Sequence, residues 1–165
     1  MAQDVVCIAN YLLSKDPSRN LFNKNLVQRN DRQFYEGNAR LNKYLHLAQN
    51  IYIAKTGEKL FSEDLFAYDN GAVAPSVQEN YAVLHSRRIV PNLPAEIQAY
   101  LDKIFVVFEN ATLDELIELS HEDNEWIDKS KHYAKASQRM NSMERVEEYR
   151  EQYSDIIMVM DRMVL

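Results

Sequence analysis

The amino-acid sequence predicts an all-α, mainly helical fold in a single compact domain over residues 1–165, and it allows one small β element near residues 65–73. Apolar residues recur at helical spacing in one segment after another, which is the main sequence signal of amphipathic helices. The 165 residues include only three glycines and four prolines. Apolar residues make up 46% and charged residues 27% of the chain, as in ordinary globular proteins rather than disordered chains.

The first helix is expected over residues 4–14. Five apolar residues fall on one side of it at helical spacing, namely Val5, Ile8, Ala9, Leu12 and Leu13. Asp4 stands where a secretory signal would carry positive charge. The lone Cys7 lies among apolar residues, so we expect a buried, unreactive thiol in a reducing, cytoplasmic setting.

The second helix is expected over residues 38–55, and it is the strongest local prediction. Its apolar stripe has the spacing i, i+3, i+4, i+7, i+10 and i+11 and consists of Leu41, Tyr44, Leu45, Ala48, Ile51 and Tyr52. Gly57 is expected to end this helix in the left-handed conformation. Residues 23–33 between the two helices are rich in Asn and lack a strong apolar period, which favours a solvated connection.

A sharp corner is expected at residues 65–81. Asp69 and Asn70 precede Gly71 as a turn tripeptide, and a short extended piece leads into it. Pro75 follows at once and suits the first turn of a new helix, where its missing N–H is not needed. The chain therefore turns sharply here and immediately begins a helix.

Three further helices complete the predicted fold. Pro94 is expected to open one of them, and Thr112 with Glu115 has the spacing of a capping box at the start of another. A long C-terminal helix is expected over residues 142–165, with apolar residues spaced 3, 4, 3, 4, 3: Val146, Tyr149, Tyr153, Ile156, Met160 and Met163. We favour packing of this stripe within the domain. A homodimer, or contact with a partner helix, through the C-terminal helix stays open.

The charges are unevenly distributed. Residues 1–60 hold nine Lys/Arg and five Asp/Glu, whereas the rest holds ten and twenty, and the net charge is −6. This acidity makes nucleic acid an unlikely partner in general. Residues 23–33 with Lys24, Arg29 and Arg32 keep a nucleic-acid-binding regulator open as the alternative function.

The sequence contains none of the familiar catalytic motifs. No glycine-rich phosphate loop or Gly-x-Ser-x-Gly elbow occurs, and His46, His85, His121 and His132 lack the spacing of a zinc helix. We therefore predict no enzyme activity, no catalytic residues, no metal and no cofactor. An enzyme with an unfamiliar site would instead hold a ligand in a polar pocket lined by His46 or His121. No apolar run is long enough for a membrane span.

Several motifs together resemble the Panacea domain of SocA-like antitoxins, a family also labelled phage-associated GepA-like proteins. The motifs are "DVVCIANYLL", "ARLNKYLHLAQNIYIAKTGEKLF", "AYDNGAVAPSV" and "LSHEDNEW", which run from Asp4 to Trp126. The matched positions that can bind or pack are Asp4, Asn10, Tyr11, Lys43, Gln49, His121 and Trp126. The chain departs from the family pattern at Arg40, His46, Tyr68, Ala72 and Glu125.

The resemblance implies an antitoxin of a toxin–antitoxin system, encoded on a phage or another mobile element, that binds and neutralises a cognate toxin protein. It also implies the option of delivering that toxin to a cytoplasmic protease as an adaptor. Our hypothesis is that Tyr68, Gly71, Val73 and Pro75 form one wall of the toxin-binding groove. The alternative is that these residues, like Asn10, Gln49 and His121, only hold helices together.

Overall fold

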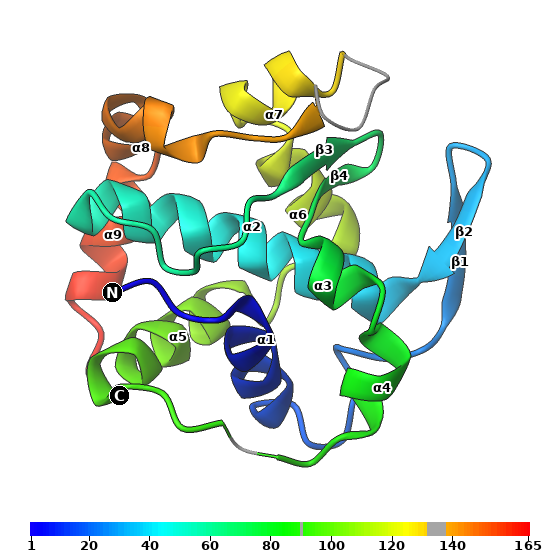
Figure 1. Cartoon of the computed structure of the whole chain (residues 1–165). Coiled ribbons are helices and arrows are strands. Elements are labelled where there is room, and N and C mark those ends of the chain that lie inside the picture. Colours follow the sequence, from blue (N-terminus) through cyan, green and yellow to red (C-terminus); the bar gives the residue numbers. More distant parts are fainter. Residues whose placement is uncertain (90, 132–137) are drawn as a thin grey trace.

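The computed structural model describes residues 1–89, 91–131 and 138–165, and these residues form a compact, mainly α structure (Figure 1). The predicted fold class is confirmed: 56% of the chain is helical and two small two-stranded sheets are present. In chain order the elements are α1 (Val5–Ser14), β1 (Leu26–Arg29), β2 (Arg32–Tyr35), α2 (Glu36–Thr56), β3 (Phe66–Tyr68), β4 (Gly71–Val73), α3 (Pro75–Gln78), α4 (Tyr81–Ser86), α5 (Ala95–Phe108), α6 (Leu113–Ser120), α7 (Asn124–Lys129), the 3₁₀ turn η2 (Ser142–Arg145), α8 (Val146–Gln152) and α9 (Ser154–Asp161).

Helix α2 runs through the middle of the protein. It crosses the centre of Figure 1 and contacts α1, α3, α5, α6, α8, β2 and β4. Every residue from Arg40 to Ile51 is buried, so the burial extends well beyond the predicted apolar stripe. A helix that is buried on all sides is the core element around which the other layers pack.

Local signals set the ends of several helices, and two of them, Gly57 and the Thr112–Glu115 pair, were predicted. Asp4 caps α1 by accepting a hydrogen bond from the N–H of Val6 at 2.7 Å. Gly57 ends α2 with a φ of 76°, and Thr112 with Glu115 forms the capping box of α6. These features depend on a few neighbouring residues, which is why sequence patterns identify them.

Two local predictions were incomplete. Pro75 begins a helix as expected, but the helix stops after Gln78 and resumes at Tyr81, because Asn80 leaves the helical conformation with φ −111° and ψ 13°. Cys7 is partly exposed rather than buried. Its side chain packs against the core without being fully covered, whereas Ile8 and Leu12 of the same helix are fully buried.

The segment between α1 and α2 is a β-hairpin rather than the solvated connection that we expected. Strands β1 and β2 pair antiparallel, from Leu26 opposite Tyr35 to Arg29 opposite Arg32. Asn30 and Asp31 connect them with φ values of 51° and 60°, the positive values that a tight hairpin turn requires at both central residues. The strands are largely exposed, so they lack the apolar alternation by which strands are recognised. The small β element predicted at residues 65–73 is present as β3 and β4.

The single C-terminal helix predicted over residues 142–165 was wrong. The structure divides this segment into η2, α8 and α9, with a break at Tyr153, whose φ is −103° and ψ is 12°. Tyr149 and Tyr153 are both buried and form hydrogen bonds with residues far away in the sequence. Those contacts hold α8 and α9 at positions that one straight helix would not reach.

A buried hydrogen-bond network joins α2, α7 and α8. The carboxylate of Asp123 accepts hydrogen bonds from His46 Nε2 at 2.6 Å and Asn50 Nδ2 at 2.9 Å through Oδ2. Its Oδ1 accepts from the Tyr149 hydroxyl at 2.7 Å and from the N–H of Glu125 at 2.9 Å. Burial raises the pKa of Asp123, but the interactions with His46, Asn50 and Tyr149 outweigh burial and hold this pKa below its usual value of 3.8. The ionised carboxylate is therefore part of the native core.

We expect Asp123→Ala to lower the free energy of unfolding by about 3–5 kcal/mol, because it leaves three buried polar side chains without their shared partner. The depressed pKa means that the carboxylate stabilises the fold above about pH 3.8 and that this contribution is lost as the pH falls further. Urea unfolding of both proteins between pH 7 and pH 3 measures the difference. Asp128→Ala, at an exposed position in the same helix, is the control, and an equal loss in both variants would contradict the prediction.

Candidate functional site

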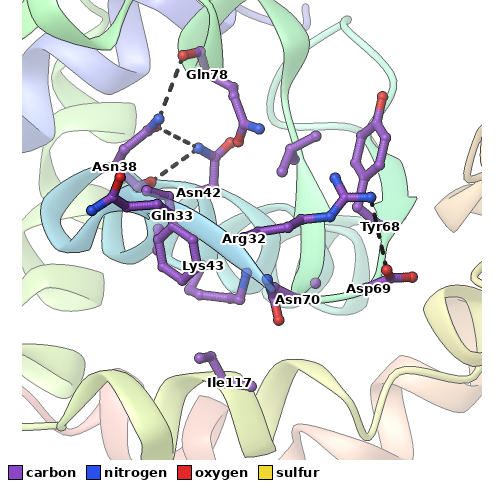
Figure 2. Close-up of a pocket in the computed structure, with 14 residues that line it drawn as sticks. Arg32, Gln33, Asn38, Asn42, Lys43, Tyr68, Asp69, Asn70, Gln78 and Ile117 are labelled. Atoms are coloured by element: carbon purple, nitrogen blue, oxygen red, sulfur yellow. Dashed lines mark hydrogen bonds and ion pairs between the residues drawn. The ribbon is translucent and has the colours of Figure 1, made fainter. Parts of the chain in front are cut away.

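A groove of about 330 Å³ opens beside the Gly71 corner, and we call it the corner groove (Figure 2). Its walls come from β2, the first half of α2, the β3–β4 turn, α3 and α6. Tyr68, Gly71 and Val73, three of the four predicted partner-binding residues, line it together with Lys43. Pro75, the fourth, is the first residue of α3 and is not among the lining residues.

Amide side chains connect the walls of the corner groove. Asn42 Oδ1 accepts a hydrogen bond from the N–H of Ala74 at 2.9 Å, and Asn42 Nδ2 donates to Asn38 at 3.0 Å. Asn38 Nδ2 in turn donates to the carbonyl of Gln78 at 3.4 Å. Figure 2 shows this chain of amides between α2 and α3. The groove wall is thus held at a fixed distance from α2.

Lys43 lies beneath the corner and is 3% exposed. Burial, and after it the positive charge of Arg29, lowers the pKa of Lys43 to about 8. Within residues 1–89, 91–131 and 138–165, no hydrogen bond or ion pair holds the ammonium, and residues 90 and 132–137 contain no Asp or Glu. A β-carbon at Gly71 would overlap Lys43 Nζ and Cε. The absence of a side chain at Gly71 therefore leaves room for the ammonium.

His121 and Trp126 support the other side of the corner. Their rings stack with centroids 3.9 Å apart and an interplanar angle of 6°, and Trp126 Nε1 donates a hydrogen bond to the carbonyl of Tyr68 at 3.0 Å. Burial, followed by the charge of Lys43, lowers the pKa of His121 to about 4. The imidazole is therefore neutral at physiological pH. Family-motif residues from two distant segments, Lys43 on α2 and the stacked pair of His121 and Trp126, thus lie beside the corner.

The remaining family-motif residues lie away from the groove and make contacts within the chain. Gln49 donates to the carbonyl of Phe61 at 3.0 Å and accepts from the N–H of Leu60 at 2.7 Å. The Tyr11 hydroxyl donates to Asp102 at 2.7 Å, and Asn10 is buried on the same helix, α1. Asp4 caps that helix, as described above.

Sequence patterns did not point to most of the polar lining of the groove. Gln33 comes from the unpredicted hairpin, and Arg32 was predicted only as part of a basic patch. Asn42 is buried and lies within the second motif, but neither it nor Asn38 and Gln78 was singled out. One signal could have indicated the hairpin. Asn30 and Asp31 form a turn dipeptide between two short segments.

The basic residues of the hairpin have acidic neighbours. Arg29 Nη1 lies 3.0 Å from Asp114 Oδ1, and Arg32 Nη2 lies 3.8 Å from Asp69 Oδ2. The ammonium of Lys24 lies 5.6 Å from the centre of the Tyr35 ring. Two of the three cations of the predicted basic patch are thus paired within the chain.

The described part of the chain contains neither a metal site nor a membrane-spanning helix. No group of three His, Cys, Asp or Glu side chains there is arranged to hold a metal ion; His132 lies outside the described residues. His46, one of the two histidines considered as ligand-binding, is fully buried against Asp123. None of the described helices is both long and apolar enough to cross a membrane.

Lys43→Met should stabilise the protein by roughly 3 kcal/mol at pH 7, because it removes an unpaired buried charge. The unfolded chain keeps the lysine proton up to about pH 10.5, whereas the folded protein releases it near pH 8. The free energy of unfolding of the wild type therefore rises relative to that of the variant between pH 8 and pH 10.5. Urea unfolding at several pH values measures the gap between the two proteins, and a gap that does not narrow from pH 8 to pH 10.5 would refute the lowered pKa.

Gly71→Ala should destabilise the protein by about 1–3 kcal/mol for the backbone alone, since Gly71 has a φ of 128°. The new β-carbon would also force the end of the flexible Lys43 side chain to shift. Gly57→Ala is the control for a glycine at a helix end, because its φ is 76° and its β-carbon would lie 3.6 Å from Arg150 Nη2. Thermal unfolding should show the larger loss for Gly71→Ala, because a φ of 128° is less accessible to a residue with a side chain than a φ of 76°; an equal loss would contradict the prediction.

Comparison with known proteins identifies the family. The family described as "Antitoxin SocA-like, Panacea domain" matches residues 41–127, slightly more than half of the chain. This range includes Lys43, the Gly71 corner and the stacked pair of His121 and Trp126, but not the first motif at residues 4–13. No curated protein and no solved structure gives a significant match. The predicted resemblance is confirmed, and the chain belongs to the SocA-like antitoxin family with a Panacea domain.

Proposed function

We propose that this protein is an antitoxin that binds a cognate toxin and neutralises it by direct contact, with the corner groove as the surface that meets the toxin. Family membership supports an antitoxin-like function in general, which implies a toxin partner and suggests a non-enzymatic role. The binding of a particular toxin, the use of the groove and a location in the cytoplasm are parts of the proposal.

The single observation that carries the proposal is the convergence of motif residues at the groove. Lys43 and Gly71, from two separate segments, line one surface depression, and Trp126, from a third, donates a hydrogen bond to the carbonyl of Tyr68 in the wall of that depression. Tyr68 is partly exposed in the groove wall, and partly exposed aromatic side chains often serve as anchors at protein interfaces. A groove with a fixed polar wall and an aromatic edge suits a protein segment.

Two finer proposals concern further partners. An adaptor function that delivers the toxin to a cytoplasmic protease needs a second surface, separate from the groove. Met158 and Val159 on α9 are 51% and 55% exposed, and they offer such a surface or the contact of a homodimer through the C-terminal segment. Apolar side chains at neighbouring exposed positions favour association.

The alternative of a nucleic-acid-binding regulator has less support. Arg29 and Arg32 have Asp114 and Asp69 as acidic neighbours, which reduces the positive charge that phosphates would meet. Retention on DNA that falls steeply with salt, and that is lost in an Arg29→Ala, Arg32→Ala double variant, would favour this alternative over the antitoxin.

Co-expression tests the antitoxin function. We expect the product of the neighbouring reading frame to arrest growth of a bacterial host, this protein to restore growth, and the two to be recovered together through a tag. Tyr68→Ala should weaken the complex by about 1–2 kcal/mol or more, because it removes an aromatic anchor, while the melting temperature of the free protein changes little.

The control is Val83→Ala, at a residue of α4 that is 55% exposed and lies outside the groove. It should leave the rescue of growth and the recovered complex unchanged. The antitoxin proposal would be refuted if the product of the neighbouring reading frame did not arrest growth and no partner were recovered with this protein. A toxin that binds Tyr68→Ala as tightly as the wild type would refute the groove as the binding surface and leave the antitoxin function in place.

A further inference from the structure

We propose that the corner groove is a carboxylate-binding site and that the ammonium of Lys43 is its cation. The carboxylate belongs to an Asp or Glu side chain of a bound protein or to a free small molecule. Only the assignment of that side chain to a toxin rests on the proposed function; the site itself stands on the geometry of this chain.

The charge of Lys43 has no partner among the described residues. Lys43 is 3% exposed, yet none of the described residues pairs with its ammonium, and the undescribed residues contain no carboxylate. A buried charge without a partner is costly, and proteins normally provide a counter-ion or replace the residue. Because Lys43 lines the groove, a ligand in the groove can reach it and supply the missing negative charge.

The absence of a side chain at Gly71 leaves space around the ammonium of Lys43. Gly71 lies directly against Lys43 Nζ, with no room for a β-carbon. Its φ of 128° is one that residues with side chains rarely adopt. Figure 2 shows Arg32, Lys43 and Asn70 close together at the groove. The corner therefore leaves room for the ammonium of Lys43, and no side chain of residue 71 covers that ammonium.

The net charge of the groove lining favours a singly charged anion. Asp69 lines the same groove and lies 3.8 Å from Arg32, so the two cations Arg32 and Lys43 and the one carboxylate leave a net charge of about +1. A single negative charge neutralises it, whereas a doubly charged phosphate would leave a net negative charge beside Asp69. Gln33 and Gln78 also line the groove and can donate hydrogen bonds to carboxylate oxygens.

The apolar part of the lining suits the stem of an acidic side chain. Phe34, Tyr68 and Ile117 line the groove beside the polar groups. The methylene groups of a Glu side chain can pack on these residues while the carboxylate reaches Lys43. The groove thus combines an aromatic edge with one buried cation.

The test follows the ε-carbon signal of Lys43 by NMR in the full chain while capped glutamate, N-acetyl-glutamate amide, is added. The neutral control ligand is the corresponding glutamine derivative, and acetate and inorganic phosphate are added in separate titrations. We expect capped glutamate and acetate to shift the Lys43 signal and to raise the pKa of Lys43 by about 1–3, as a nearby opposite charge does. The glutamine derivative should leave it unchanged.

Lys43→Met should remove the response of neighbouring groove signals to carboxylate while keeping the folded spectrum. Lys24→Met, at an exposed lysine outside the groove, should respond as the wild type does. If neither capped glutamate nor acetate changed the ε-carbon signal of Lys43, the proposed carboxylate site would be overturned. This outcome does not depend on the result of the toxin experiment. Stronger binding of phosphate than of carboxylate would overturn the assignment of the anion class.

Co-expression of Lys43→Met with the toxin distinguishes the two sources of the carboxylate. Loss of growth rescue together with loss of the carboxylate response supports an acidic side chain of the toxin. Retained rescue with a lost carboxylate response supports a free small carboxylate as the ligand. A harmless neighbouring protein would refute the proposed function alone, because the NMR response of Lys43 does not depend on it.

Discussion

The burial of α2 on all sides is the constraint on which the rest of the structure depends. Every residue from Arg40 to Ile51 is removed from solvent, and several of these residues are polar or charged. Buried polar groups need hydrogen-bond partners inside the protein. Those partners are carbonyls, amides and carboxylates of the surrounding segments, so α2 positions its neighbours through hydrogen bonds as well as through apolar contacts.

Three contacts along α2 illustrate this arrangement. Arg40 donates to the carbonyl of Ala111 at 2.7 Å, before α6 begins. Asn42 holds the chain at Ala74, where α3 begins. Asp123, which caps α7, accepts hydrogen bonds from the second half of α2. Lys43 differs from these residues, because its charge lies at the groove without a partner among the described residues, and the surface at that point is therefore the one we assign to binding.

The corner groove is built from parts with different physical origins. The Gly71 turn and its stacked support, His121 on Trp126, come from the region that defines the family. The opposite wall comes partly from β2, in a hairpin that projects from the helices in Figure 1 and has few buried side chains. Such a wall contributes little to the core, so its residues can change without loss of the fold. The corner groove thus joins a packed corner to an exposed hairpin wall.

The sequence by itself determined the helical fold class, the caps and the Gly71 corner, because each follows from the spacing or conformation of residues close together in the chain. It also indicated Lys43, Tyr68, Gly71 and Val73, through motifs. The hairpin wall and the break at Tyr153 were decided by the tertiary structure. The Tyr153 hydroxyl accepts a hydrogen bond from Asn50, 103 positions away, and the groove exists only where distant segments meet around α2. No local pattern records such contacts, since their free energy depends on the packing of the whole chain.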